Sequence, residues 1–192
     1  SFIFVVLFLS VIPLSQAVQL PPTIESIPKI GAHSFSLITN NLLGDIGDWA
    51  REAFADLDAD GDYDLLVGTS AGVIRYYRND GNSTSPNWVL ANSNLVGTID
   101  SYSSISVVDF DKDGDFDLMT GSNDGWFRYF ENTGTPASPT FVYSQAWLNG
   151  GGSVRTAPAF FDYNSDGDYD FVYGRNNDAV YKIKNDASES SL

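Results

Sequence analysis

The sequence predicts an all-β fold of β-propeller blades, made of three four-stranded repeats. Three observations support this prediction. An acidic nine-residue stretch occurs three times, 53 residues apart, and begins at Asp56, Asp109 and Asp162. Short segments rich in Val, Ile, Phe, Tyr and Trp alternate with Gly, Asn, Asp and Ser, which is typical of strands and turns. No apolar segment keeps a 3.6-residue period over the length of a helix.

The repeat extends well beyond the acidic stretches. The same offset aligns Asn79 with Asn132 and Asn185, and it aligns many other positions without a gap. A repeated four-stranded unit of about 40–50 residues is typical of propeller blades. The predicted segments are a signal peptide (1–17), a Pro-containing linker (18–34), three blade repeats (35–87, 88–140 and 141–187) and a tail (188–192).

Each repeat is expected to supply four short strands. One begins the repeat, a second leads into the acidic stretch, a third follows it, and a fourth comes after a turn. The strands expected to begin the repeats are FSLIT (35–39), WVLAN (88–92) and FVYSQ (141–145). Propellers typically close with about four to eight blades. Three repeats therefore predict a partial propeller or an open arc, or a ring completed by further blades or other chains.

The first 17 residues are predicted to be a secretory signal peptide. Phe2 to Leu14 is an apolar run that contains Pro13, and small residues follow at Ser15 and Ala17 with the spacing of a cleavage site. This run is shorter than the ~20 residues that a membrane-spanning helix needs, so an uncleaved anchor is the less favoured alternative. We expect a secreted or cell-surface protein with no membrane span apart from this segment.

The composition excludes several kinds of partner and site. A net charge of −15 disfavours nucleic acid. Of the 25 acidic residues, five, five and four lie in the three acidic stretches, so the charge indicates sites rather than general solubility. The chain has no cysteine, and His33 is its one histidine, which argues against thiolate sites, a His-rich zinc site and a Ser-His-Asp triad. We expect no enzyme activity.

The pattern D-x-[DN]-x-D-G-D-x-D predicts a Ca²⁺ site in each repeat. Side chains at positions 1, 3 and 5 of a tight loop converge, glycine at position 6 permits the turn, and the position-7 carbonyl and position-9 carboxylate complete the shell. These donors are all oxygen atoms, which Ca²⁺ prefers. The helix–loop–helix type is excluded because it needs Glu at position 12, where Val67, Thr120 and Tyr173 stand.

One ion per repeat, about three in all, is therefore expected. The expected side-chain ligands are Asp56, Asp58, Asp60 and Asp64; Asp109, Asp111, Asp113 and Asp117; and Asp162, Asn164, Asp166 and Asp170. The expected carbonyl ligands, with side chains facing solvent, are Asp62, Asp115 and Asp168, and the turn glycines are Gly61, Gly114 and Gly167. Asn164 is a neutral donor and is expected to weaken the third site. Solvated acidic turns and catalytic carboxylates are the alternatives, but three copies in register argue against both.

The residues resemble the FG-GAP/VCBS-type repeats of integrin-α-like β-propellers. The resemblance rests on FADLDADGDYDLLVG with GVIRYYRNDG, VVDFDKDGDFDLMTG with GWFRYFENTG, and FFDYNSDGDYDFVYG with AVYKIKND, and it covers residues 35 to about 187. It implies Ca²⁺ at the positions named above, in loops that join neighbouring strands of a blade. The chain departs from the family in its low repeat number and in Asp178 and Ala187, which replace glycines.

The expected function is a calcium-binding scaffold for adhesion or ligand binding, with an extracellular protein or a glycan as its partner. The alternative is an accessory or partial domain of a secreted carbohydrate-active enzyme. Asn82 begins a glycosylation sequon in a turn. The aromatic residues expected in blade packing are Trp49, Trp88, Trp126 and Trp147, for which a sugar-binding surface is the alternative, and Tyr76, Tyr77, Tyr129 and Phe130.

Overall fold

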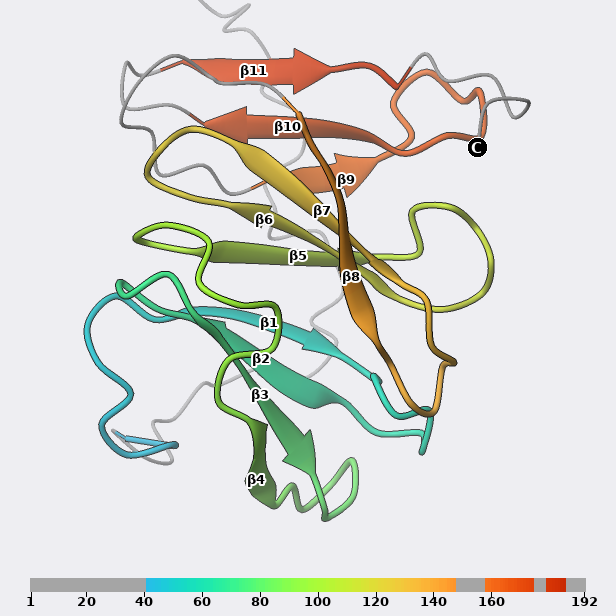
Figure 1. Ribbon diagram of the computed structural model, residues 1–192. Helices are drawn as coiled ribbons and strands as arrows, with labels where there is room; N and C mark the ends of the chain where they lie inside the picture. Colours follow the sequence, from blue (N-terminus) through green and yellow to red (C-terminus); the bar gives the residue numbers. More distant parts are fainter. Residues whose placement is uncertain (1–40, 148–157, 175–178, 186–192) are drawn as a thin grey trace, which may run out of the picture. The chain divides into compact units, whose positions relative to one another are not determined.

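The computed structural model describes residues 41–147, 158–174 and 179–185, which form eleven β-strands and no helix. The predicted signal peptide, the linker and the predicted strand at 35–39 lie outside the described residues. All neighbouring strands pair antiparallel in three sheets (Figure 1), which confirms the all-β prediction. The residues that the structure describes include no helix that could span a membrane.

Each sheet is built from strands that follow one another in the chain. The first sheet has the order β1-β2-β3-β4, formed by Arg51–Ala55, Asp64–Gly68, Ile74–Asn79 and Trp88–Asn92. The second has the order β5-β6-β7-β8, formed by Ser104–Val108, Asp117–Gly121, Phe127–Asn132 and Phe141–Trp147. The third contains β9 at Ala159–Phe161, β10 at Asp170–Gly174 and β11 at Val180–Ile183. The described strands form no closed barrel, which is consistent with a partial propeller or an open arc.

The sheets are out of phase with the sequence repeats by one strand. The segments predicted to begin the second and third repeats instead complete the first and second sheets, as β4 and β8. The reason is a tight connection between β3 and β4. Asn79 Oδ1 accepts hydrogen bonds from the N–H groups of Gly81 at 3.1 Å and Asn87 at 2.8 Å, which returns the chain directly beside β3. A periodic sequence gives the length of a unit but not the strand at which the unit begins.

The core lies between successive sheets. The middle strands β2 and β6 are buried along their whole length. Leu66 of β2, Ile105 of β5 and Leu118 of β6 share one apolar cluster. Met119 of β6 lies in another cluster with Phe171 of β10. Because adjacent side chains of a strand point to opposite faces, β6 contributes to the packing on both sides of its sheet.

Candidate metal centres

Three acidic loops connect the first two described strands of each sheet, and they share one backbone conformation. Position 4 is left-handed in each loop, with φ of 58° at Ala59, 64° at Lys112 and 61° at Ser165. Position 6 also has a positive φ, of 98°, 100° and 94° at Gly61, Gly114 and Gly167 respectively. A Cβ atom on any of these glycines would meet no atom within 4 Å. Glycine is therefore favoured by the backbone conformation and not by a lack of space.

Hydrogen bonds within each loop orient its carboxylates. In the first loop, Asp56 accepts the N–H groups of Asp60 and Gly61, both at 3.1 Å. Asp60 Oδ1 in turn accepts the N–H of Asp62 at 3.1 Å. This second bond, from position 7 to position 5, recurs at 3.1 Å in the other two loops. The carboxylates thus hold the loop wound, and the wound loop holds the carboxylates close together.

Carboxylate oxygens converge in the first two loops. In each of them, three oxygens from different residues lie within 4.8 Å of one another. Oxygens that bind one Ca²⁺ at 2.3–2.6 Å are at most about 5 Å apart, so both groups fit this cation. The described part of the third loop has no such group of three acidic residues. The two groups are Asp56, Asp58 and Asp60, and Asp109, Asp111 and Asp117.

Buried oxygens without partners mark the same two loops. The Oδ1 atoms of Asp58, Asp62, Asp109 and Asp115 are buried and have no hydrogen-bond partner. Burial of a carboxylate oxygen without a donor or a counter-ion is costly. A bound cation would satisfy Asp58 and Asp109, which belong to the two converging groups. The residues present therefore fit a Ca²⁺ ion in each of these loops.

Burial and the crowding of carboxylates raise pKa values in both of these loops. Burial raises the pKa of Asp58, and the nearby carboxylates of Asp64 and Asp60 raise it further. In the second loop, burial and then repulsion from Asp113 raise the pKa of Asp115 to about 6. The ionised forms are therefore disfavoured in the absence of a counter-ion. A cation in the loop would lower these pKa values again.

The carboxylate at position 9 fastens the loop to the sheet. Asp64, which is 1% exposed, accepts hydrogen bonds from the Leu57 N–H at 3.1 Å and the Tyr76 hydroxyl at 2.9 Å, both through Oδ2. Its Oδ1 accepts the Asn79 N–H at 2.8 Å. Both oxygens are thus acceptors for groups of the loop and of β3. Asp64 also lies outside the group of three converging residues in its loop.

The other two sheets have a corresponding hydrogen-bonded aspartate, but Asp117, unlike Asp64, also belongs to the converging group of its loop. Asp117 accepts bonds from the Phe110 N–H, the Tyr129 hydroxyl and the Asn132 N–H at 3.0, 3.0 and 2.8 Å. In the third sheet, Asp170 keeps the two backbone donors, at 3.3 and 2.7 Å, but Lys182 stands where the tyrosine would be. The tyrosine hydroxyls were not predicted as site residues. Their constant distance of 12 residues after the position-9 aspartate was the available signal.

The expectation that position-7 side chains face solvent is wrong for two of the three loops. Asp62 and Asp115 are only 9% and 7% exposed. Asp62 lies within hydrogen-bonding reach of the Asn79 side chain, and Asp115 is enclosed between the second loop and the first. Both carboxylates are thus covered by residues of a neighbouring strand or loop, and the nine-residue pattern does not encode these neighbours. Asp168 of the third loop is intermediate in exposure.

The third loop already contains cationic partners. Lys112 reaches across from the second loop, with its Nζ 2.7 Å from Asp168 Oδ1. Lys184 Nζ lies 3.8 Å from Asp166 Oδ2. The pKa of Asp166 is lowered by the backbone N–H of Asp168, then by the Asn164 amide, and further by the two lysines. Its charge is therefore better compensated than the charges in the first two loops.

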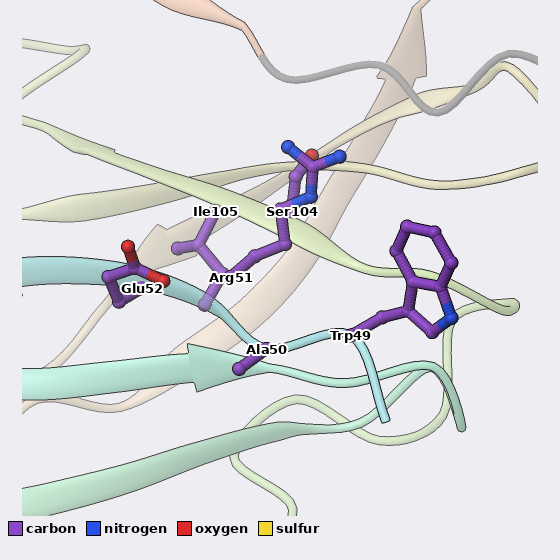
Figure 2. Close-up of a pocket in the computed structure, with 6 residues that line it drawn as sticks. All are labelled: Trp49, Ala50, Arg51, Glu52, Ser104 and Ile105. Atoms are coloured by element: carbon purple, nitrogen blue, oxygen red, sulfur yellow. The ribbon is translucent and has the colours of Figure 1, made fainter. Parts of the chain in front are cut away.

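A separate pocket of about 360 Å³ lies where β1 and β5 begin, away from the acidic loops. Figure 2 shows Trp49, Arg51, Glu52 and Ser104 around it, and Trp49 is 56% exposed. The Trp49 ring meets the Tyr102 ring edge to face at 5.8 Å. Both residues have a positive φ, 60° and 59°, which is uncommon for aromatic residues. Trp49 therefore does not have the buried packing role that was expected of it.

The other tryptophans and the sequon are placed as follows. Trp88 and Trp147 are partly buried and pack against core clusters, as expected for blade residues. Trp126 is intermediate in exposure. Asn82 is exposed in the β3–β4 connection, where its Oδ1 accepts the Thr84 N–H at 3.0 Å. The sequon is thus accessible, and its modification stays a prediction.

Comparison with known families supports the repeat assignment. The sequence model of the FG-GAP-like repeat family matches residues 56–120. This segment begins at the first residue of the first acidic loop and ends within β6, so it contains both loops in which carboxylate oxygens converge. No curated protein and no solved structure matches the chain.

Proposed function

We propose that this chain, an FG-GAP-type repeat protein, binds Ca²⁺ in its acidic loops and uses the stiffened sheets as a secreted scaffold for an extracellular ligand. The observation that carries the proposal is the convergence of three carboxylate oxygens in each of the first two loops. The unpartnered Oδ1 atoms of Asp58 and Asp109 within these groups support it. Only oxygen atoms converge there, which suits a hard cation and not zinc or copper.

The three loops would bind the ion with different strength. The first two offer three converging carboxylates each, whereas the third has the neutral Asn164 and the cation Lys184 beside Asp166. We therefore propose that the third site is the weakest. Extracellular modules bind Ca²⁺ with Kd values of about 10⁻⁴–10⁻³ M. Such modest affinity is sufficient outside the cell, where the apolar N-terminal segment would direct the chain.

The ion would act on the fold and not on a reaction. Each loop joins two strands of one sheet and is clamped to a third strand by the position-9 carboxylate. Neutralising its remaining charges removes repulsion that favours an open loop. Binding to the folded state alone stabilises it by mass action, by about 2.7 kcal/mol for each site at 100 times its Kd. The role is therefore structural, and no enzyme activity is proposed.

The pocket beside Trp49 favours a glycan among the possible ligands. An exposed indole can stack on a sugar ring, and Arg51 and Glu52 can donate and accept hydrogen bonds at its hydroxyl groups. A glycan array compared with the Trp49→Ala variant tests this point. Binding to the same glycans by native protein and variant would contradict it. Glycan binding would suit both an adhesion module and the accessory domain of a carbohydrate-active enzyme.

Thermal unfolding with and without Ca²⁺ tests the main proposal. The melting temperature should rise with Ca²⁺, much less with the same concentration of Mg²⁺, and return on addition of a chelator. Asp58→Asn should reduce the rise because it changes a converging ligand. Asp80→Asn is the matched control, since Asp80 pairs with Arg78 outside the acidic loops. An equal melting temperature with Ca²⁺ and with chelator would refute calcium binding.

A further inference from the structure

A second pocket, of about 180 Å³, lies between the first and second acidic loops. Asp56 and Ala59 of the first loop line it, together with Asp115 and Phe116 of the second loop and Pro136 of the β7–β8 connection. Asp115 is 7% exposed, and its Oδ1 has no hydrogen-bond partner. The pocket thus combines a buried, uncompensated negative charge with apolar walls.

The next junction along the chain shows which group compensates such a charge. Between the second and third loops, the ammonium group of Lys112 lies 2.7 Å from Asp168 Oδ1. Lys112 follows Ala59 by 53 residues, and Asp168 follows Asp115 by the same distance. The backbones at Lys112 and Ala59 have nearly equal φ, 64° and 58°, so their side chains leave the loop in corresponding directions. At the junction of the second and third loops, the Lys112 ammonium group thus contacts the position-7 carboxylate. At the junction of the first and second loops, Ala59 is too short to reach Asp115, and the corresponding space is the pocket.

We propose that the pocket between the first two loops binds the ammonium group of a lysine side chain presented by a partner polypeptide. Leu57, Phe116 and Pro136 supply apolar surface for the methylene chain of the lysine. Asp115 supplies the carboxylate for a charge-assisted hydrogen bond. The net charge of −15 attracts basic partners over a distance. The site requires no metal ion, so this inference goes beyond the proposed function.

Titration with Nα-acetyl-lysine methylamide, followed by NMR of the backbone amides, tests the pocket directly. In Ca²⁺-saturated buffer we expect saturable shifts at residues 56–59 and 114–116. The norleucine analogue has the same carbon chain without the ammonium group and should produce no saturable shift. Asp115→Asn should weaken binding at least about tenfold. Absence of saturable shifts, or equal shifts with norleucine, would overturn the proposal.

The dependence on Ca²⁺ separates this site from the metal centres. The lysine probe should bind both with saturating Ca²⁺ and with chelator, and more tightly with chelator, because a cation in the second loop reduces the attraction of Asp115 for the ammonium group. If Ca²⁺ displaces the probe, the probe occupies the metal centre and the proposal is wrong. If Ca²⁺ has no effect on melting but the probe binds at the pocket, the calcium proposal fails and this one stands.

Filling the pocket from within gives a second test. Ala59→Lys should reproduce the Lys112–Asp168 contact, abolish binding of the lysine probe, and melt at a higher temperature than Ala59→Met, which fills the same space without charge. This difference should disappear when Asp115→Asn is added to both variants. A melting temperature of Ala59→Lys equal to or below that of Ala59→Met would show that no ammonium site exists there.

Discussion

Replacement of Asp64 by asparagine is expected to destabilise the folded protein by about 2–4 kcal/mol. Asparagine keeps the shape of the side chain, and its carbonyl oxygen can still accept the Asn79 N–H. The amide NH₂, however, would face the Leu57 N–H and the Tyr76 hydroxyl, which both donate to Oδ2 in the native protein. The hydroxyl can rotate and accept a bond from the new amide, but the Leu57 N–H is left buried without an acceptor.

The magnitude follows from these contacts. A buried donor without a partner costs about 1–3 kcal/mol, and bonds to a charged acceptor contribute about 1.5–3 kcal/mol against about 0.5–1.5 kcal/mol for neutral ones. Free-energy losses within one hydrogen-bond network are not fully additive. The expected total is therefore about 2–4 kcal/mol and not the sum of the separate terms. Asp170→Asn should cost less, because its clamp lacks the tyrosine hydroxyl.

Urea unfolding in saturating Ca²⁺ and in chelator is the decisive assay. If Asp64 acts as a clamp, the loss of unfolding free energy should be the same in both conditions. In a double-mutant cycle with Tyr76→Phe, the two changes should couple by about 1 kcal/mol, since they remove parts of one hydrogen bond. A loss confined to the calcium-loaded protein would refute this reasoning and assign Asp64 to the metal shell. A loss below about 0.5 kcal/mol in both conditions would refute both roles.

Three further predictions concern pH, backbone conformation and the third loop. Without metal, the free energy of unfolding should fall as the pH rises from about 4 to about 6. Burial raises the pKa of Asp115 to about 6, so the folded state binds more protons there than the unfolded state over this interval. A melting temperature in chelator that rises with pH over the same interval would contradict this prediction. Gly72→Ala should lower the free energy of unfolding in urea by about 2–4 kcal/mol, because φ is +77° and a Cβ would lie 1.7 Å from the Asp100 carbonyl oxygen. Gly61→Ala should cost only about 1 kcal/mol, because a Cβ there would meet no atom within 4 Å. Equal losses of unfolding free energy in the two variants would show that the backbone does not approach Gly72 closely. Lys184→Met should lower the Kd for Ca²⁺ at the third loop by about two- to fivefold, because it removes an ammonium group 3.8 Å from Asp166. Calorimetry measures this Kd, and an unchanged or higher value would show that Lys184 does not compete with the ion.

The positions of the acidic loops could be predicted from sequence because their determinants are local. Each loop carries its own glycine turn and its own oxygen donors within nine residues, and the strands after it have the composition of buried strands. The strand at which each sheet begins could not be predicted in this way. It depends on the Asn79 side chain, which closes the β3–β4 connection and places residues 88–92 in the first sheet.

The β character of this protein, its 53-residue period and the residues of its three acidic loops could all be predicted from composition and from spacing along the chain. The hydrogen-bond and charge partners of the individual carboxylates depend on contacts that form only on folding. Asp64 and Asp117 fasten loops to strands through donors 12 and 15 residues away. Asp115 turns inward beside a neighbouring loop, and Asp168 meets a lysine 56 residues before it in the chain. A carboxylate has the same chemistry at every position, and its role is fixed by the donors and charges that folding brings around it.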